Sequence, residues 1–269
     1  MKNIIEMKNI NFKYGEKYLF KNFNLNIERG SFTTIIGTNG SGKSTLIRII
    51  LGLLVAEGEI NINGKQLNRK NLKDIISKIG VVFENPDDQF VAETVMDDIA
   101  FSLENMNVEP KEIKSRIKKI SKFIGLEDIL EKEPHTLSGG QKQLVALAAA
   151  LVTDPDILIL DEALTMIDLE IREKIYKILE QINKVNKITI INVTHDMDEI
   201  LYGDNLIVID NGNIVLEGPK EYVLMEEKTF NKLGLKLPFV VELSTKLQYY
   251  GLTKHLIFDM EELVDVIWK

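Results

Sequence analysis

The sequence contains no cysteine, which excludes disulfide bonds and thiolate metal sites. Any bound metal is therefore expected to have oxygen ligands. Basic residues are also in deficit, because 33 Lys and Arg stand against 41 Asp and Glu and give a formal net charge of −8. Domains that bind nucleic acid usually present a basic face, so no nucleic-acid partner is expected.

Long apolar runs are missing as well. The longest candidates are interrupted by Arg48, Asp161 and Glu162, and none approaches the ~18–20 residues that a membrane span needs. At the N-terminus Glu6 and Lys8 break the apolar run, so no signal peptide is expected. We therefore expect a soluble chain that can still dock on a membrane protein. Its 269 residues allow one large domain, or one domain with a small appendage.

One glycine-rich stretch organises the rest of the sequence. Residues 37–45, the phosphate loop, read GTNGSGKST and fit the pattern G-x-x-x-x-G-K-[ST]. Residues 32–36 before it read as a buried strand and residues 46–51 after it as a helix, a context that a chance glycine-rich turn would lack. Backbone N–H groups and the helix N-terminus would then cradle a polyphosphate. The residues expected to bind nucleotide are Gly37, Thr38, Asn39, Gly40, Ser41, Gly42, Lys43, Ser44 and Thr45.

Three of these residues have side chains with a distinct expected task. Lys43 would reach the β- and γ-phosphates as a point charge, which makes it a catalytic candidate. Ser44 would ligate Mg²⁺, and Thr45 would lie against the α-phosphate. Tyr14, at the end of the first predicted strand, is either a plain strand-end aromatic or a stacking platform for adenine, and the sequence leaves both alternatives open.

Strand-like and helix-like segments alternate along most of the chain. Strands are predicted at 4–12, 19–20, 23–27, 32–36, 59–65, 78–83, 157–161, 187–193, 206–209 and 214–216. Residues 94–123 and 143–152 read as helices, so an all-helical insert is predicted at about 85–155. The alternation predicts an α/β fold with a parallel sheet covered by helices. A composition shift at Gly218-Pro219 separates residues 1–218 from a predicted helical extension, 219–269, with helices at 221–233, 238–250 and 260–268.

Further candidates for chemistry lie after the insert. Residues 137–141, LSGGQ, form a second glycine-bearing loop that opens a helix and offers its N-terminus to an anion. The run ILIL at 157–160 ends in Asp161 and Glu162, as in a central parallel strand that delivers carboxylates to its carboxyl end. His195 follows another predicted buried strand, whereas His135 and His255 are expected to be structural.

These motifs, in this order, resemble the nucleotide-binding subunit of an ATP-binding-cassette (ABC) transporter over roughly residues 4–218. Within that family, residues 83–90 (FENPDDQF), 93–95 and 97–101 are similar to the A-component ATPases of energy-coupling factor (ECF) transporters, which take up vitamins and transition-metal ions in prokaryotes. The resemblance implies a P-loop NTPase cassette with a RecA-like parallel sheet core, an antiparallel β subdomain, a helical insert and a small C-terminal helical extension.

The resemblance also implies an ATPase that uses ATP and Mg²⁺. Asp161 and Glu84 would join Ser44 as metal ligands, and Glu84 is also a catalytic candidate. Glu162 would act as general base on the attacking water, and His195 would contact the γ-phosphate and help to hold Glu162. The loop residues Ser138, Gly139, Gly140 and Gln141 would close on the ATP of an opposite subunit, so the functional unit would be a homodimer or heterodimer of ABC ATPase chains.

Other partners follow from the same resemblance: a transmembrane coupling subunit and a substrate-binding membrane subunit, with this chain peripheral at the cytoplasmic face. Residues 164–168 match the D-loop of the family, with Asp168 as a cross-interface contact. Asp87 and Asp88 belong to an acidic group near the insert that is either a solvated face or a groove for basic coupling helices. A nucleotide-dependent dimerising ABC protein with little turnover, or with a role outside transport, is the alternative function.

Three positions depart from the family pattern. Glu84 stands where most members have Gln and adds negative charge near the γ-phosphate. Leu144 stands where Arg is common after the LSGGQ loop, and Leu164 where Thr is common before the D-loop. An altered rate or coupling is therefore expected at Glu84.

Overall fold

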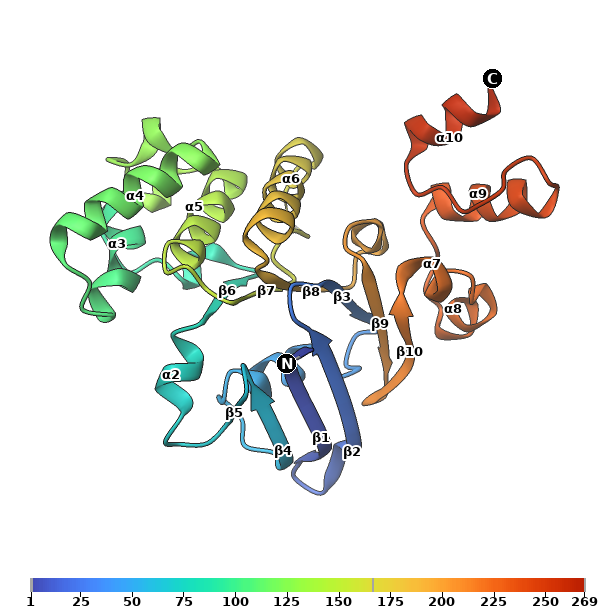
Figure 1. The fold of residues 1–269 in the computed structure, drawn as a ribbon, viewed down its shortest axis with the longest axis horizontal. Helices are drawn as coiled ribbons and strands as arrows, with labels where there is room; N and C mark the ends of the chain where they lie inside the picture. The colour runs from blue at the N-terminus through green and yellow to red at the C-terminus, as the bar shows by residue number, and fades with distance from the viewer. Residues whose placement is uncertain (1, 166, 269) are drawn as a thin grey trace.

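The computed structural model describes residues 2–165 and 167–268 as two sheets with helices around them (Figure 1). The smaller sheet is antiparallel, in the order β2-β1-β4-β5. It consists of β1 (Asn3–Tyr14), β2 (Lys17–Glu28), β4 (Glu57–Ile62) and β5 (Lys65–Gln66). The two short strands predicted at 19–20 and 23–27 are one strand, β2, because an irregular register with β1 accommodates the intervening residues.

The larger sheet carries the predicted parallel strands, in the order β10-β9-β3-β8-β7-β6. Its members are β3 (Phe32–Gly37), β6 (Ile79–Phe83), β7 (Ile157–Asp161), β8 (Thr189–Thr194), β9 (Asn205–Asp210) and β10 (Asn213–Pro219). All neighbouring pairs are parallel except β9 and β10, which form an antiparallel pair at one edge. The carboxyl ends of β3, β7 and β8 therefore lie at the same edge of the sheet, where chemistry concentrates in such folds.

Helices cover both faces of the larger sheet. The cassette part contains α1 (Lys43–Ile50), α2 (Leu72–Ile76), α3 (Val95–Asn105), α4 (Pro110–Ile124), α5 (Gly139–Leu151) and α6 (Leu169–Asn186), together with the 3₁₀ turns η1 (Pro86–Asp88), η2 (Glu127–Ile129), η3 (Pro134–Thr136) and η4 (Met197–Leu201). The sequence did not predict α2. Helix α5 begins at Gly139 rather than at 143, because Ser138 and Gln141 form a capping box that satisfies its first N–H groups.

The C-terminal extension contains α7 (Lys220–Val223), α8 (Glu227–Leu233), α9 (Phe239–Tyr249) and α10 (Met260–Ile267). The single helix predicted at 221–233 is therefore wrong, since the chain breaks it into α7 and α8. Figure 1 shows the extension at the β10 side of the large sheet and α3–α5 at the opposite side. Of the described residues, none lies in a helix that is long and apolar enough to cross a membrane.

The core explains why the strand run at 157–160 is apolar throughout. Ile157 and Ile159 pack with α1 and the small sheet, whereas Leu158 and Leu160 pack with the helices α3–α6 on the other face. A strand buried on both faces has no polar alternation. A third cluster joins Ile36 and the β9 side chains to α8 and α9 of the extension, so the extension shares a hydrophobic core with the large sheet.

Candidate active site

The phosphate loop connects β3 to α1 in a tight curve. A Cβ atom on Gly37 would lie 2.1 Å from the carbonyl oxygen of Ile209, so only glycine fits there. Gly42 is the N-cap of α1 and has φ 113, a conformation that L side chains rarely adopt. These two glycines shape the loop and direct the N-terminus of α1 toward its concave side.

Lys43 is almost fully buried within the loop. Its Nζ donates to the carbonyl oxygens of Gly37, at 2.8 Å, and Thr38, at 3.3 Å. The same nitrogen lies 4.0 Å from Oε1 of Glu162. Burial lowers the pKa of Lys43, although the carboxylates of Glu162 and Asp161 act in the opposite direction. An anion bound in the loop would therefore find a partly desolvated ammonium group.

The predicted acids and His195 meet at the carboxyl ends of β7 and β8. Because Asp161 is in register with Val193, Glu162 lies beside the exit of β8 and its N–H donates to the carbonyl oxygen of Val193 at 2.8 Å. Nδ1 of His195 lies 2.8 Å from Oε2 of Glu162, close enough for Nδ1–H to donate to the carboxylate. The structure thus joins Lys43, Glu162 and His195 into one constellation.

Glu162 has a left-handed backbone, with φ 54. Such a conformation costs on the order of 1–3 kcal/mol for a residue with a side chain, and it persists only where the surroundings impose it. Here the hydrogen bond to Val193 and the contacts with Lys43 and His195 fix the residue. The strained backbone indicates that the fold places the Glu162 side chain at a defined position.

Asp161 fits the role of a metal ligand on its own geometry. Its Oδ1 is buried without a hydrogen-bond partner, as is Oγ of Ser41 in the loop. Burial, with help from the neighbouring Glu162 carboxylate, raises the pKa of Asp161 to about 6. A cation would satisfy this orphaned oxygen. Among the described residues, no three His, Asp or Glu side chains are grouped so that they could hold a metal ion by themselves.

The other two predicted metal ligands, Ser44 and Glu84, are solvent-exposed. Ser44 lies in the first turn of α1, and Glu84 directly follows β6. The charge of Glu84 contributes to the raised pKa of Asp161, so the two carboxylates act on each other electrostatically. Tyr14 lies beside the phosphate loop, with its hydroxyl 3.2 Å from Oγ1 of Thr45 and about half of the residue exposed. Its stacking on adenine stays a prediction.

The LSGGQ loop makes its side-chain contacts within its own helix cap. Oγ of Ser138 accepts from the N–H of Gln141 at 3.3 Å, and Oε1 of Gln141 accepts from the N–H of Ser138 at 3.1 Å. Gly139 is exposed, and a Cβ placed on it would meet nothing within 4 Å. Gly140 is buried, and a Cβ placed on it would lie 3.0 Å from the Ile171 side chain. The loop is therefore open to a ligand or to another chain at Gly139.

Two residues after this loop were not singled out in the sequence. Nε2 of Gln143, which is buried, donates to the carbonyl oxygens of Phe83 at 3.0 Å and Ala163 at 2.5 Å. It thereby links α5 to the residue before Glu84 and to the residue after Glu162. Lys142 forms an ion pair of 2.6 Å with Asp87. The available signal was a glutamine at the start of an otherwise apolar helix, which is too weak to interpret without a structure.

The D-loop prediction lies partly outside the described residues, because it includes Met166. Leu164 is buried, and Asp168 is the exposed N-cap of α6, where its side chain accepts from the N–H of Ile171 at 3.0 Å. Of the remaining histidines, His135 lies on the surface with Nε2 3.2 Å from a Glu133 oxygen.

The sequence profile described as "ABC transporter" matches residues 20–165 of this chain. The protein named energy-coupling factor transporter ATP-binding protein EcfA1 from Ligilactobacillus salivarius is 44% identical over 267 residues, which cover 98% of this chain and 95% of that protein. The chain belongs to the ABC transporter family. A protein named EcfA from Pediococcus pentosaceus is 42% identical, covering 97% of this chain and 95% of that protein.

Solved structures agree with this assignment. The ABC ATPase is similar to cbiO1 from Clostridium perfringens, described as part of the ABC transporter complex cbiONQ, with a TM-score of 0.79, 36% identity and coverage of 90% of this chain and 99% of that one. It is also similar to a dimeric ATP-binding cassette, MJ0796, in a post-hydrolysis state with ADP and phosphate, with a TM-score of 0.72, 32% identity and coverage of 80% and 98%. The predicted fold class is confirmed, and so are ATP hydrolysis coupled to transport and the use of ATP with Mg²⁺.

The raised pKa of Asp161 predicts a measurable effect on stability. Between the ordinary pKa of 3.8 and the folded value of about 6, the folded state holds a proton that the unfolded state has lost. The contribution of Asp161 to stability therefore falls as pH rises through this window. Above the window the folded protein bears the full free-energy cost of burying the ionised Asp161 carboxylate. Asp161→Asn should make the nucleotide-free ABC ATPase more stable at about pH 8, by on the order of 2 kcal/mol, and the gain should shrink toward pH 4.

Thermal unfolding at several pH values measures this effect, with Asp128→Asn on the exposed η2 turn as the matched control. The control should show no such dependence. A gain for Asp161→Asn that is the same at every pH would contradict the assignment of the shift to Asp161. The variant should also lose most of the stabilisation that Mg²⁺ and ATP give to the wild type, because it lacks the anionic ligand.

Proposed function

We propose that this chain is the ATP-hydrolysing subunit of an ECF-type transporter that takes up a micronutrient, a vitamin or a transition-metal ion. The contact of 2.8 Å between His195 and Glu162, beside the buried Lys43, is the observation that carries the hydrolytic part. The relatives named EcfA1 and EcfA support the transport part. In this proposal the chain is peripheral, at the cytoplasmic face of the cell membrane, and has no nucleic-acid partner.

The partners in this proposal are a second ABC ATPase chain, a transmembrane coupling subunit and a substrate-binding membrane subunit. The exposed position of Gly139 in the Ser138 loop, where a Cβ would meet nothing within 4 Å, leaves room for the nucleotide of a second chain. The dimeric neighbour MJ0796 supports such pairing. We further propose residues 1–218 as the nucleotide-binding domain, with the helical insert at about 85–155, and residues 219–269 as the extension.

The proposed mechanism assigns one task to each side chain at the edge of the large sheet. Bound Mg²⁺, held by Ser44, Asp161 and Glu84, would supply charge neutralisation to the phosphates. Glu162 takes the proton of the attacking water. The hydrogen bond from its N–H to the carbonyl oxygen of Val193 fixes the position of Glu162 for this task. His195 holds the Glu162 carboxylate and offers its other ring nitrogen toward the γ-phosphate.

The remaining contacts bind and orient the nucleotide. Lys43 leaves the carbonyl oxygens of Gly37 and Thr38 to meet the β- and γ-phosphates, and the N–H groups of residues 37–45 surround them. Tyr14 would stack on the adenine ring. Residues 138–141 of the second chain would close the pocket, with Asp168 contacting across the interface.

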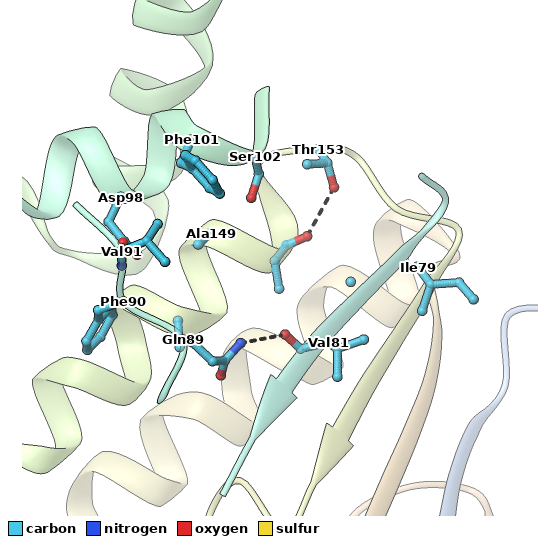
Figure 2. A pocket seen from close by; sticks show the side chains of 13 residues that line it. Ile79, Val81, Gln89, Phe90, Val91, Asp98, Phe101, Ser102, Ala149 and Thr153 are labelled. Atoms are coloured by element: carbon cyan, nitrogen blue, oxygen red, sulfur yellow. Dashed lines mark hydrogen bonds between the residues drawn. The ribbon is translucent and has the colours of Figure 1, made fainter. Parts of the chain in front are cut away.

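A groove between the edge strand β6 and the helices α3 and α5 is the proposed seat of the transmembrane coupling subunit (Figure 2). The cavity there has a volume of about 170 Å³, and Gln89, Phe90, Phe101 and Thr153 line it. Gln89 occupies the edge of β6: its Nε2 donates to the carbonyl oxygen of Val81 at 3.2 Å, and its Oε1 accepts from the N–H of Phe83 at 3.0 Å. An inserted segment would therefore contact residues adjacent to Glu84.

Several acids beside this groove have structural partners in the same chain. Asp98 is buried and accepts from the N–H groups of Val91 and Ala92, and burial raises its pKa. Asp97 accepts from the hydroxyl of Thr94, and Asp87 pairs with Lys142. The acidic surface left for a basic partner is therefore smaller than the sequence indicated. Asp88 is the residue of this surface that we choose for a test of docking.

Asp88→Lys should weaken co-purification of the membrane subunits, because the new charge would repel a basic coupling segment. The matched control is Glu127→Lys on the exposed η2 turn, which should leave co-purification intact. Both variants should retain ATP binding, measured with a fluorescent analogue. Equal recovery of the membrane subunits with Asp88→Lys and Glu127→Lys would remove Asp88 from the docking surface.

The test of the function as a whole is purification of the native complex with a tag on this chain. We expect membrane proteins and a second ATPase chain to co-purify, and the complex in liposomes to take up one vitamin or metal ion only when ATP is hydrolysed. Recovery of the tagged chain without membrane proteins, or ATP hydrolysis with no uptake of any tested micronutrient, would contradict the proposal.

A further inference from the structure

The segment that follows His195 is held from α6 at two points. Asp196 caps η4 through Oδ1, which accepts from the N–H of Asp198 at 2.9 Å, while its Oδ2 lies 2.6 Å from Nη1 of Arg172. One turn further along α6, the hydroxyl of Tyr176 donates to Oε2 of Glu199 at 2.8 Å. Residues 172 and 176 share a face of the helix, so α6 contacts both the N-cap and the middle residue of η4, the turn that follows His195.

The Tyr176–Glu199 bond belongs to a buried polar triad. Asn192, on β8 three residues before His195, donates from Nδ2 to Oε2 of Glu199 at 2.9 Å and to the hydroxyl of Tyr176 at 3.1 Å. The three residues are at most 1% exposed. Burial raises the pKa of Glu199 despite these two donors. Burying three polar side chains costs free energy of folding. A turn that only connects two strands would not need such a group.

The opposite side of η4 packs against the C-terminal extension. Ile200 lies in the cluster that contains Phe230 and Val241, with Leu201 against it. Nζ of Lys220 donates to the carbonyl oxygen of Leu201 at 2.6 Å and lies 5.1 Å from the centroid of the Phe258 ring. The turn is therefore fixed between α6 and the extension and has little freedom of its own.

We propose that Tyr176, Glu199 and Arg172 are positioning residues that set the His195 ring against Glu162. They act from both flanks of His195: Asn192 and Glu199 anchor β8 to η4, and Arg172 anchors Asp196. Since α6 begins at Asp168, which belongs to the proposed dimer interface, the same contacts give the interface a rigid connection to His195. This inference rests on the proposed role of His195 in hydrolysis.

Tyr176→Phe is the sharpest test, because it removes one hydroxyl and leaves the ring stacked on Tyr202 at 3.6 Å between centroids. We expect kcat for ATP to fall about tenfold with KM changed less than about twofold, since a misplaced catalytic group affects the chemical step more than binding. Glu199→Gln keeps the oxygen that accepts both bonds and should stay within about threefold of the wild-type kcat. Tyr202→Phe, on the other member of the stack, is the matched control and should leave kcat unchanged.

A second readout observes His195 directly and does not need activity. The chain has three histidines, so the His195 ring can be followed by nuclear magnetic resonance with His135 and His255 as internal references. Tyr176→Phe should shift the ring signals of His195 alone. Arg172→Met, which removes the ion pair with Asp196 and keeps an unbranched side chain, should produce the same selective shift.

Unchanged kcat and unchanged His195 signals in Tyr176→Phe would overturn the inference, even if that variant unfolds at a lower temperature, because the triad would then be only structural. An equal loss in Tyr202→Phe would overturn it as well. A wild-type protein without ATPase activity would instead contradict the proposed function, and the nuclear magnetic resonance measurement would still decide whether the triad sets His195.

Discussion

Glu162→Gln is expected to lower the rate of phosphate release by at least ~100-fold, the range that a general base contributes. The Glu162 side chain lies between Lys43 and His195, and these contacts help to hold its strained backbone in place. Glutamine fills the same space and can keep the hydrogen bond to His195, but it cannot take a proton from water. Binding of Mg²⁺ and ATP should therefore survive while the chemical step fails.

The second part of this prediction is a change of assembly. Since ATP is retained, the variant should accumulate as a dimer with nucleotide trapped between two chains, which size-exclusion chromatography with light scattering measures. Glu170→Gln, an exposed position on α6, is the matched control and should behave as the wild type. A wild-type protein that releases no phosphate would favour the alternative of a dimerising module with little turnover, and a Glu162→Gln variant that still turns over would contradict the assigned base.

Mixing two inactive variants is expected to restore activity. Lys43→Ala removes the phosphate-binding ammonium, and Ser138→Arg places a bulky cation beside the open position at Gly139 in the LSGGQ loop. Each alone should reduce hydrolysis to background, because both sites of a symmetric dimer lose one half. In a mixed dimer one site combines both defects, whereas the other combines an intact phosphate loop with an intact LSGGQ loop.

Random pairing should therefore recover about a quarter of the wild-type activity, since half of the dimers are mixed and each has one intact site of two. The control is a mixture of Lys43→Ala with Lys43→Ala,Ser138→Arg, in which no intact site can form. Absence of recovery in this chain alone, with recovery once a second ABC ATPase chain is supplied, would identify a heterodimer. Absence of recovery in both settings would contradict a site shared between chains.

Local sequence patterns predicted most of the strands and assigned the candidate site residues to the ends of strands. The phosphate loop, the acids after β7 and His195 after β8 each follow an apolar strand, and parallel strands bring such ends to one edge. The predicted element boundaries were wrong where contacts with neighbouring elements determine them. The two short strands predicted at 19–20 and 23–27 form one strand, β2, because both pair with β1. Helix α2 was not predicted, because its five residues are too few to show a helical periodicity.

The contacts between motifs could not be predicted from the sequence. The capping box moved the start of α5 to Gly139, and Gln143 joined Phe83 to Ala163 across the sheet. Near the insert, Asp98 is buried and accepts a hydrogen bond from the N–H of Val91, and Asp87 pairs with Lys142; the sequence indicated neither contact. These outcomes depend on which side chains are within about 3 Å in space, and separation along the chain carries no such information.

The sequence by itself determined the phosphate loop, the acidic strand end and the order of motifs, because each depends on residue types at fixed spacing along one strand, turn and helix. Only the tertiary structure decided which groups act on one another: that burial beside Glu162 raises the pKa of Asp161, that His195 contacts Glu162, and that a buried triad under η4 holds the turn after His195. The physical reason is that burial and hydrogen-bond geometry arise from packing between elements, which no single segment contains.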